Sequence, residues 1–248
     1  KENRFGNLEE LVQITLKLKD LNEAKSYISN NFQLRIPKPE KEKLKAPLIL
    51  NKDNLKQIIS DHSYWKDRGI SPPTLEFFES GIMRSGKMKD RHVFPIFDRG
   101  GRLLGVAGRD ITNKQQLKWK LIGEKRLWGY PLKYNLKYLQ AEKEVFLVES
   151  IGDMLSLWEA GVKNTIVTFG LSITSKIKQI LMVIDPKKIY ISFNNDENYA
   201  GNRAANKARN NLLRQFDEQQ LGIKLPPTND FGSMSREEIL KWKSQIKK

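Results

Sequence analysis

The sequence contains no cysteine and no long apolar run. Without cysteine the chain can form neither a disulfide nor a thiolate zinc site, which fits a reducing compartment. No apolar run approaches the roughly 20 residues needed to cross a bilayer, and the opening KENRFGNLEE lacks the apolar core of a signal peptide. We therefore expect a cytoplasmic protein with no membrane partner.

Acidic residues are in the minority, with 29 Asp and Glu against 44 Lys and Arg and a net charge of +15. Such an excess favours a polyanionic partner, because each phosphate neutralised by a cation releases counterions. The alternative is a solvated, lysine-rich surface. Residues 84–126 carry twelve Lys and Arg against four Asp and Glu, a net +8 in 43 residues. This concentration favours the nucleic-acid interpretation.

The length of 248 residues allows one large or two modest domains with a real core. Helical patterns cover about 8–18 and 22–30, and the charged, proline-punctuated PKPEKEKLKAP at 37–47 predicts a linker. We place boundaries so that 1–46 holds the N-terminal helices and linker, 47–140 a basic subdomain, 141–234 a second domain and 235–248 a C-terminal helix.

The basic subdomain is predicted to combine helices with an antiparallel hairpin. From Asp53 to about Ser80 the pattern is helical, with Leu55, Ile58 and Ile59 on one face. HVFPIFDRGGRLLGVAGRDI then predicts two strands joined at 98–101, where glycine supplies the positive φ of a hairpin turn.

From residue 144 onward, strand and helix patterns alternate. Strands are expected at 145–148, 165–169, 188–193 and, weakly, 222–225, with helices at 153–160, 172–183 and 200–216. Alternation at this spacing predicts βαβ units and a parallel sheet. Ser235 and Glu238 form a capping box for a last helix. The expected fold class is α/β, α+β overall, with a smaller mixed subdomain before the parallel sheet.

Acidic side chains follow two of these strands. Glu149 ends the first, with Asp153 capping the next helix, and Asn194 and Asp196 follow the third. Ligands bind at the carboxyl ends of parallel strands, Mg²⁺ prefers oxygen ligands, and neighbouring carboxylates repel one another unless a cation lies between them. We predict a metal site here. The alternative is a helix cap beside a solvated Glu149 and an asparagine-rich turn.

The basic segment before the parallel sheet carries three cationic side chains and an aromatic one that could bind nucleic acid. Arg91 precedes one strand of the hairpin, Arg109 follows the other, and Lys118 is next to Trp119. Aromatic rings can stack on bases while cations hold phosphates. The alternative is a Trp119 packed in the core with cations around its edge.

Several sequence motifs along the chain resemble those of known families. VESIGDML resembles the E-G-x-x-D-x-L motif of Toprim domains, and ISFNNDENYAGNRAA resembles their D-x-D-x-x-G-x-x-A-A. DRHVFPIFDRGGRLLGVAGRDI, LKWKLIGEKRLWGYP and YWKDRGISPPTLEFFESGI are similar to segments of DnaG-type bacterial and phage primases. The resemblance covers roughly residues 60–215. Ser150 stands where Toprim domains usually have glycine, Asn194 replaces the first aspartate of D-x-D, and Asn198–Tyr199 look inserted.

The resemblance implies a DNA primase core with a Toprim domain, a nucleotidyltransferase that makes short RNA primers from ribonucleoside triphosphates on single-stranded DNA in DNA replication. Glu149 and Asp196 would be the essential catalytic acids and Asp153 a supporting one. Mg²⁺ or Mn²⁺ would bind Glu149, Asn194 and Asp196. Template or nucleotide would bind Arg91, Arg109, Lys118 and Trp119.

Further partners follow only from the resemblance. It implies that zinc belongs to a module cut off from this chain, and that a replicative helicase is a separate partner. The compact, lysine- and asparagine-rich sequence favours a bacteriophage origin. Two alternatives stay open: a Toprim nuclease or strand-cleaving enzyme, and a non-catalytic relative that only binds single-stranded nucleic acid, which Asn194 would favour.

Overall fold

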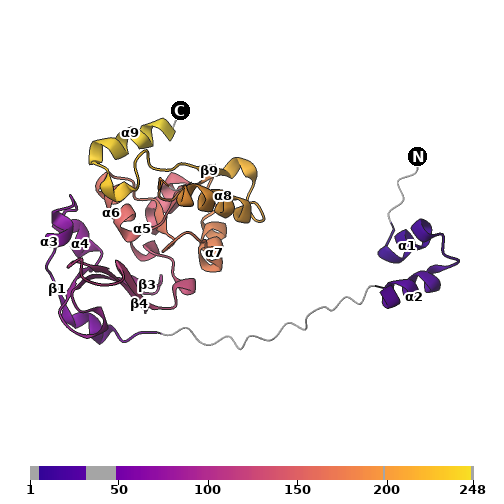
Figure 1. The fold of residues 1–248 in the computed structure, drawn as a ribbon, viewed down its shortest axis with the longest axis horizontal. Helices are drawn as coiled ribbons and strands as arrows, with labels where there is room; N and C mark the ends of the chain where they lie inside the picture. Colours follow the sequence, from indigo (N-terminus) through magenta and orange to yellow (C-terminus); the bar gives the residue numbers. More distant parts are fainter. Residues whose placement is uncertain (1–5, 32–48, 198, 247–248) are drawn as a thin grey trace. The chain divides into compact units, whose positions relative to one another are not determined.

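The computed structural model describes residues 6–31, 49–197 and 199–246. Two compact units, 1–46 and 47–248, make up the chain (Figure 1). In the first, helices α1 (Leu8–Leu16) and α2 (Leu21–Asn31) confirm the two helices predicted there. The Asn7 side chain caps α1 by accepting the N–H of Glu10, whose carboxylate accepts the N–H of Asn7 in return. The linker predicted at 37–47 lies outside the described residues.

An antiparallel sheet of five strands begins the second unit, in the order β1-β2-β3-β4-β5. Its strands are β1 (Ile58–Ile59), β2 (Gly81–Met83), β3 (Arg91–Phe97), β4 (Leu103–Asp110) and β5 (Trp119–Gly123). Around it are η1 (Lys52–Gln57), α3 (Ser63–Lys66), α4 (Pro72–Phe77), η2 (Gly86–Met88) and η3 (Lys125–Leu127). The predicted hairpin is confirmed as β3–β4, and Gly101 in its turn has φ +75°.

One prediction in this subdomain is wrong. Leu55, Ile58 and Ile59 do not share a helical face, because Ile58 and Ile59 form β1 and pair with Met83 and Ile82 of β2. Adjacent β-branched residues favour a strand. Their partner strand, β2, is more than 20 residues away in the sequence, so the local hydrophobic pattern could not reveal the pairing.

A parallel sheet with strand order β7-β6-β8-β9 forms the rest of the unit. Its elements are α5 (Leu132–Glu142), β6 (Glu144–Val148), α6 (Ile151–Glu159), β7 (Thr165–Val167), α7 (Ser175–Ile184), β8 (Lys188–Ser192), α8 (Ala200–Leu212), η4 (Glu218–Gln220), β9 (Leu221–Ile223), η5 (Phe231–Ser233) and α9 (Arg236–Ile246). The predicted βαβ alternation is confirmed, with element ends shifted by a few residues; α5 was not predicted. None of the helices in the described part of the chain is long and apolar enough to span a membrane.

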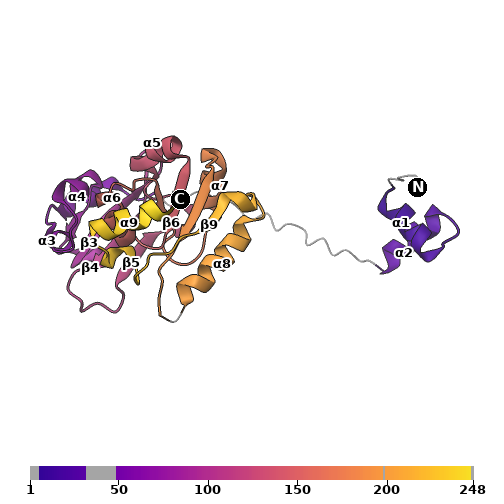
Figure 2. The ribbon, with the colours of Figure 1, turned by 90° about the horizontal axis from the view of Figure 1, so that it is seen from above.

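The strands of this sheet are apolar on both faces because helices cover both. Val145 and Leu147 of β6 face a core shared with α5, α7 and α8. Phe146 and Val148 face the opposite core, which contains α6 and α9. Figure 1 and Figure 2 both show α9 beside α6. A continuous apolar run such as Val145–Val148 is what burial on both faces requires.

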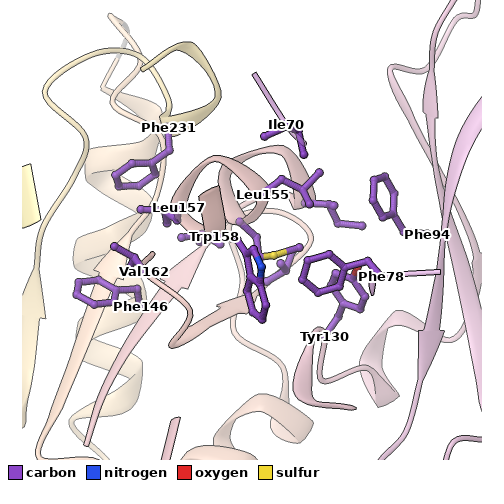
Figure 3. Packing of buried hydrophobic residues seen from close by; sticks show 14 of the residues in the cluster. Ile70, Phe78, Phe94, Tyr130, Phe146, Leu155, Leu157, Trp158, Val162 and Phe231 are labelled. Atoms are coloured by element: carbon purple, nitrogen blue, oxygen red, sulfur yellow. The ribbon is translucent and has the colours of Figure 1, made fainter. Parts of the chain in front are cut away.

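Helix α6 joins the two sheets. Figure 3 shows it between Phe94 of β3 on one side and Phe146 of β6 on the other. Leu155 is fully buried, and the Trp158 ring packs edge-on to that of Phe78 with 4.9 Å between centroids. Because α6 packs against both sheets within this one core, its N-terminus is fixed between the antiparallel sheet and the ends of the parallel strands.

Buried His92 predicts loss of stability in acid. Its Nε2 lies 3.0 Å from the Ser80 hydroxyl, and burial, with a smaller contribution from His62, lowers the pKa of His92 to about 3. In the unfolded state this histidine is protonated below about pH 6.5. In the folded state it stays neutral down to about pH 3, so between these pH values the unfolded state binds one more proton than the folded state. Stability is therefore present above this window and lost within it.

We expect the parent to lose roughly 3 kcal/mol more unfolding free energy than His92→Gln between pH 7 and pH 4. Urea unfolding of both proteins at several pH values in this range measures the difference. Other titrating groups cancel because they are common to both. Parallel pH profiles would contradict a buried, neutral His92.

Candidate metal and nucleic-acid site

Glu149 and the segment Asn194–Asp196 lie at the same edge of the parallel sheet. Strands β6 and β8 are adjacent and parallel, with Val148 paired to Ser192, so the residues that follow both strands emerge together. The Glu149 carboxylate accepts the backbone N–H of Asn194. The predicted neighbourhood of the two tips is therefore present.

The pKa of Glu149 is raised. Burial is the main cause, followed by the charges of Asp153 and Asp196, and the hydrogen bond from Asn194 offsets only part of it. Burial and neighbouring negative charges disfavour the ionised carboxylate, and either a bound proton or a bound cation offsets this cost.

The side chain of Asn194 gives the most direct indication of a cation-binding site. Its side-chain oxygen Oδ1 is buried and has no hydrogen-bond partner among the described residues. Helix α8 approaches closely here: a Cβ added to Gly201 would lie 1.7 Å from the backbone carbonyl oxygen of Asn194. Unpaired buried oxygens need an explanation, and a hard cation coordinated by oxygen supplies one.

The donor set fits magnesium chemistry without forming a finished cage. Within 6–31, 49–197 and 199–246, no three Asp, Glu or His side chains are clustered closely enough to hold a metal by themselves. Glu149, Asp196 and Asn194 instead offer two carboxylates and one amide oxygen. Mg²⁺ commonly binds one or two carboxylates and completes its shell with water and substrate phosphate.

Asp153 has a different role at the start of α6 from the one predicted. Ser150 caps α6, while Asp153 completes the capping box: its Oδ2 accepts the Ser150 N–H at 3.1 Å and hydroxyl at 2.7 Å. The sequence prediction of Asp153 as the cap was wrong because Ser150 occupies the extended position just before the helix. Burial raises the pKa of Asp153 to about 6.

The second carboxylate oxygen of Asp153 holds a segment that carries Asp230, an acid that the sequence did not predict to be at the site. Oδ1 accepts the backbone N–H of Phe231 at 3.1 Å, which fixes the segment carrying Asp230. The backbone N–H of Asn195 also donates to the Asn229 carbonyl at 2.7 Å, so the second tip is tied to the same segment. The charge of Asp230 contributes to the raised pKa of both Asp153 and Glu149. Its position after the weak strand β9 was the available signal.

Arg109 and Trp119 form the opposite, basic side. The Arg109 Nε donates to the Tyr64 hydroxyl at 2.9 Å, and its guanidinium lies 5.8 Å from the centre of the Trp119 ring. Trp119 is partly exposed and Lys118 is exposed. These positions leave a cation and an aromatic surface open to a ligand.

Arg91 is buried and directed at the main chain. It is 3% exposed, and its guanidinium donates to the carbonyls of Gly108 and Leu117 at 3.1 and 2.9 Å, with a longer contact to that of Lys118. In the structure it holds the segment before β5 and thereby positions Lys118.

Two neighbouring cavities bring the basic and acidic sides together. One, of about 270 Å³, is lined by Arg109 and Trp119 from the antiparallel sheet and by Asp153 and Asp230 from the part of the unit that holds the parallel sheet. The other, of about 210 Å³, is lined by Trp119 and Glu149. Trp119 and Ser150 belong to both, so the cavities adjoin, and we refer to the two together as the cleft. Lys118, Asn194 and Asp196 are not among the lining residues.

Comparison with known proteins gives this arrangement a context. Residues 146–233 match the Toprim-like family model. A DNA primase of Helicobacter pylori is 30% identical over 146 residues, which cover 56% of this chain and 25% of the relative. One of Borreliella burgdorferi is 30% identical over 165 residues, covering 62% and 30%. The chain thus spans between a quarter and a third of the length of these curated relatives.

Solved structures share the fold. A DnaG primase catalytic domain bound to single-stranded DNA superposes with a TM-score of 0.65 at 22% identity, covering 76% of this chain and 71% of that one. A DnaG catalytic core gives 0.65 at 20% identity, covering 78% and 76%. The zinc-binding and RNA polymerase domains of the Aquifex aeolicus primase give 0.63 at 19% identity, covering 98% and 69%.

Proposed function

We propose that this chain, which has the fold of a DnaG-type primase core, makes short RNA primers on a single-stranded DNA template. The observation that carries the proposal is the cleft in which Glu149 and Asp153 face Arg109 and Trp119. Acids that hold a cation and a basic, aromatic wall that holds nucleic acid are the two components that nucleotidyl transfer on a template requires. The two curated relatives described above are DNA primases.

In this proposal Glu149 and Asp196 are the essential acids, with Asn194 as a neutral third ligand. Bound Mg²⁺ or Mn²⁺ would supply a lowered pKa for the attacking 3′-hydroxyl and charge neutralisation for the triphosphate. Asp153, both of whose oxygens already accept hydrogen bonds, positions the segment with Asp230, and Asp230 adds negative charge at the edge of the site.

Arg109, Lys118 and Trp119 are assigned to template and nucleotide. The guanidinium and ammonium groups would hold phosphates, and the Trp119 ring would stack on a base. Arg91 acts indirectly, through its hold on Leu117 and Lys118. A replicative helicase, a cytoplasmic location and a bacteriophage origin remain predictions from the sequence alone.

A product assay separates this proposal from its alternatives. The protein is incubated with end-labelled single-stranded DNA, labelled ribonucleotides and Mg²⁺ or Mn²⁺, and products are resolved on a denaturing gel. New short RNA supports a primase. A shortened DNA strand supports a Toprim nuclease instead, and template binding without either product supports a non-catalytic relative, the alternative that the neutral Asn194 favours.

Asn194→Asp should strengthen metal binding. It replaces an unpaired amide oxygen with a carboxylate beside Glu149, and an added negative charge near a divalent cation favours binding. We expect the Mn²⁺ dissociation constant, measured by water-proton relaxation, to fall by about fivefold or more. Asn195→Asp, one residue along, is the matched control and should change it less. Unchanged Mn²⁺ affinity in Asn194→Asp would remove residue 194 from the ligand set.

Loss of Trp119 or Arg109 should weaken binding of single-stranded DNA. Stacking on an aromatic ring contributes about 1–3 kcal/mol per base, so Trp119→Ala should raise the dissociation constant about tenfold, measured by fluorescence anisotropy. Arg109→Gln should also flatten the dependence on salt, because one phosphate contact is lost. Arg126→Gln, which removes an exposed arginine outside both cavities, is the control. Equal effects of the two arginine variants would indicate only general attraction to a basic surface.

A further inference from the structure

A third cavity, of about 480 Å³, lies between the β3–β4 turn and helices α5 and α7. Phe97 and Leu104 line it from the hairpin, Leu136 from α5, and Ile180 and Val183 from α7. We call this cavity the hairpin groove. It shares no lining residue with the two cavities of the cleft.

The hairpin groove is at the other end of the hairpin from Arg109. In β3 and β4, Arg91 pairs with Asp110 at one end and Phe97 with Leu103 at the other. A strand rises about 3.3 Å per residue, so the two ends are roughly 20 Å apart. A molecule in the groove would therefore leave the cleft accessible.

The groove is apolar at its floor and open at one wall. Val183 is 75% exposed, although it is a branched apolar residue at the end of an amphipathic helix. Ile180, which also lines the groove, is buried, and Gly129 lets its side chain approach the main chain, because a Cβ on Gly129 would lie 2.3 Å from Ile180 Cδ1. An exposed apolar wall over a hollow is typical of a binding surface.

Cations surround this floor. Arg99, Arg102 and Lys176 line the groove, and its one lining acid, Asp98, is held by the Arg102 guanidinium at 2.6 Å. The rim therefore has an excess of positive charge. The lining side chains are mainly aliphatic, with Phe97 as the one aromatic ring, and Lys133 lies 3.9 Å over that ring. Bases that stack need open aromatic faces, so the groove does not suit single-stranded nucleic acid.

We propose that the hairpin groove docks an acidic, amphipathic helical segment of a partner protein. Apolar side chains on one face of such a helix would fill the space beside Val183 and Ile180, and its carboxylates would meet Arg99 and Lys176. Docking here tethers the chain to a second protein and leaves the Arg109 side free, so it goes beyond primer synthesis and does not depend on it.

A designed peptide tests the groove directly. The probe is a fluorescein-labelled peptide of about four helical turns, with leucine at i, i+3, i+4 and i+7 spacing and glutamate elsewhere. A second peptide replaces each glutamate with lysine. Both are titrated with the full chain by anisotropy at about 150 mM salt, where long-range attraction is screened.

Two variants on α7 locate the binding. Val183→Glu places a charge on the groove wall, and Met182→Glu, half exposed on the same helix but outside the lining, is the matched control. We expect saturable binding of the acidic peptide, weakened about tenfold or more by Val183→Glu and less than about twofold by Met182→Glu. The lysine peptide should bind at least about tenfold more weakly.

Several results would overturn the proposal. Equal loss in both α7 variants, or no saturable binding, would mean that the groove is not the site. Displacement of the peptide by single-stranded DNA would show attraction to a basic surface only. If the parent sediments as a dimer and Val183→Glu as a monomer, the groove holds a second copy of the chain instead. None of these outcomes depends on primer synthesis.

Discussion

Replacing Glu149 with glutamine is expected to reduce ribonucleotide incorporation by at least about 100-fold. The side chain keeps its size and can still accept the Asn194 N–H, but the charge that attracts a divalent cation is gone. Burial and the neighbouring acids already raise the pKa of Glu149, so the neutral amide should not destabilise the fold. Incorporation of labelled ribonucleotide at saturating template measures the effect, with unfolding followed in parallel.

Glu197→Gln is the matched control, because Glu197 is an exposed acid that directly follows Asp196. It should retain incorporation within about twofold of the parent. Template affinity should be unchanged in both variants, since the binding side chains are on the opposite wall. A Glu149→Gln protein that is folded, binds template and still incorporates ribonucleotide would remove Glu149 from the catalytic role.

The second large effect is expected at Gly201. A Cβ at this position would lie 1.7 Å from the Asn194 carbonyl oxygen, so Gly201→Ala forces α8 away from the tip of β8. We expect a loss of about 1–3 kcal/mol of unfolding free energy, the typical range for overpacking with a backbone shift. Weaker Mn²⁺ binding should accompany it, because Asn194 and Asp196 move. Chemical denaturation and metal titration measure the two effects.

Gly152→Ala provides the comparison. Gly152 is inside α6, and an added Cβ would meet its nearest neighbours at 3.5 Å, an ordinary contact. Alanine favours a helix over glycine by about 1 kcal/mol, so this variant should be as stable as the parent or slightly more so. If Gly201→Ala behaves like Gly152→Ala in both measurements, close packing of α8 on the strand tip does not shape the site.

Regular burial made much of the fold predictable. The run Val145–Val148 is apolar throughout because α5, α7 and α8 cover one face of β6 while α6 and α9 cover the other. Such a run ends where the strand leaves the core, and that is where Glu149 lies. The β3–β4 hairpin could also be predicted from the sequence, because its turn needs a residue with positive φ and Gly101 supplies it.

What could not be predicted depends on contacts between distant segments. Only its position after the weak strand β9 hints at a role for Asp230; the hydrogen bond from the Phe231 N–H to Asp153, 78 positions earlier, brings it to the site. Arg91 has the residue type of a phosphate ligand, yet the carbonyls of Gly108 and Leu117 occupy its guanidinium. Ile58 and Ile59 fit a helical face by spacing but found a strand partner in β2.

The most direct test of the central claim is the sequence of the RNA product. A short RNA annealed to single-stranded DNA is extended with all four ribonucleotides and Mn²⁺, which bypasses initiation, and the products are sequenced. The cleft that joins Glu149 to Arg109 and Trp119 predicts RNA complementary to the template, absent in Glu149→Gln. Additions that ignore the template, or no extension by a protein shown to bind both the annealed template and Mn²⁺, would contradict it.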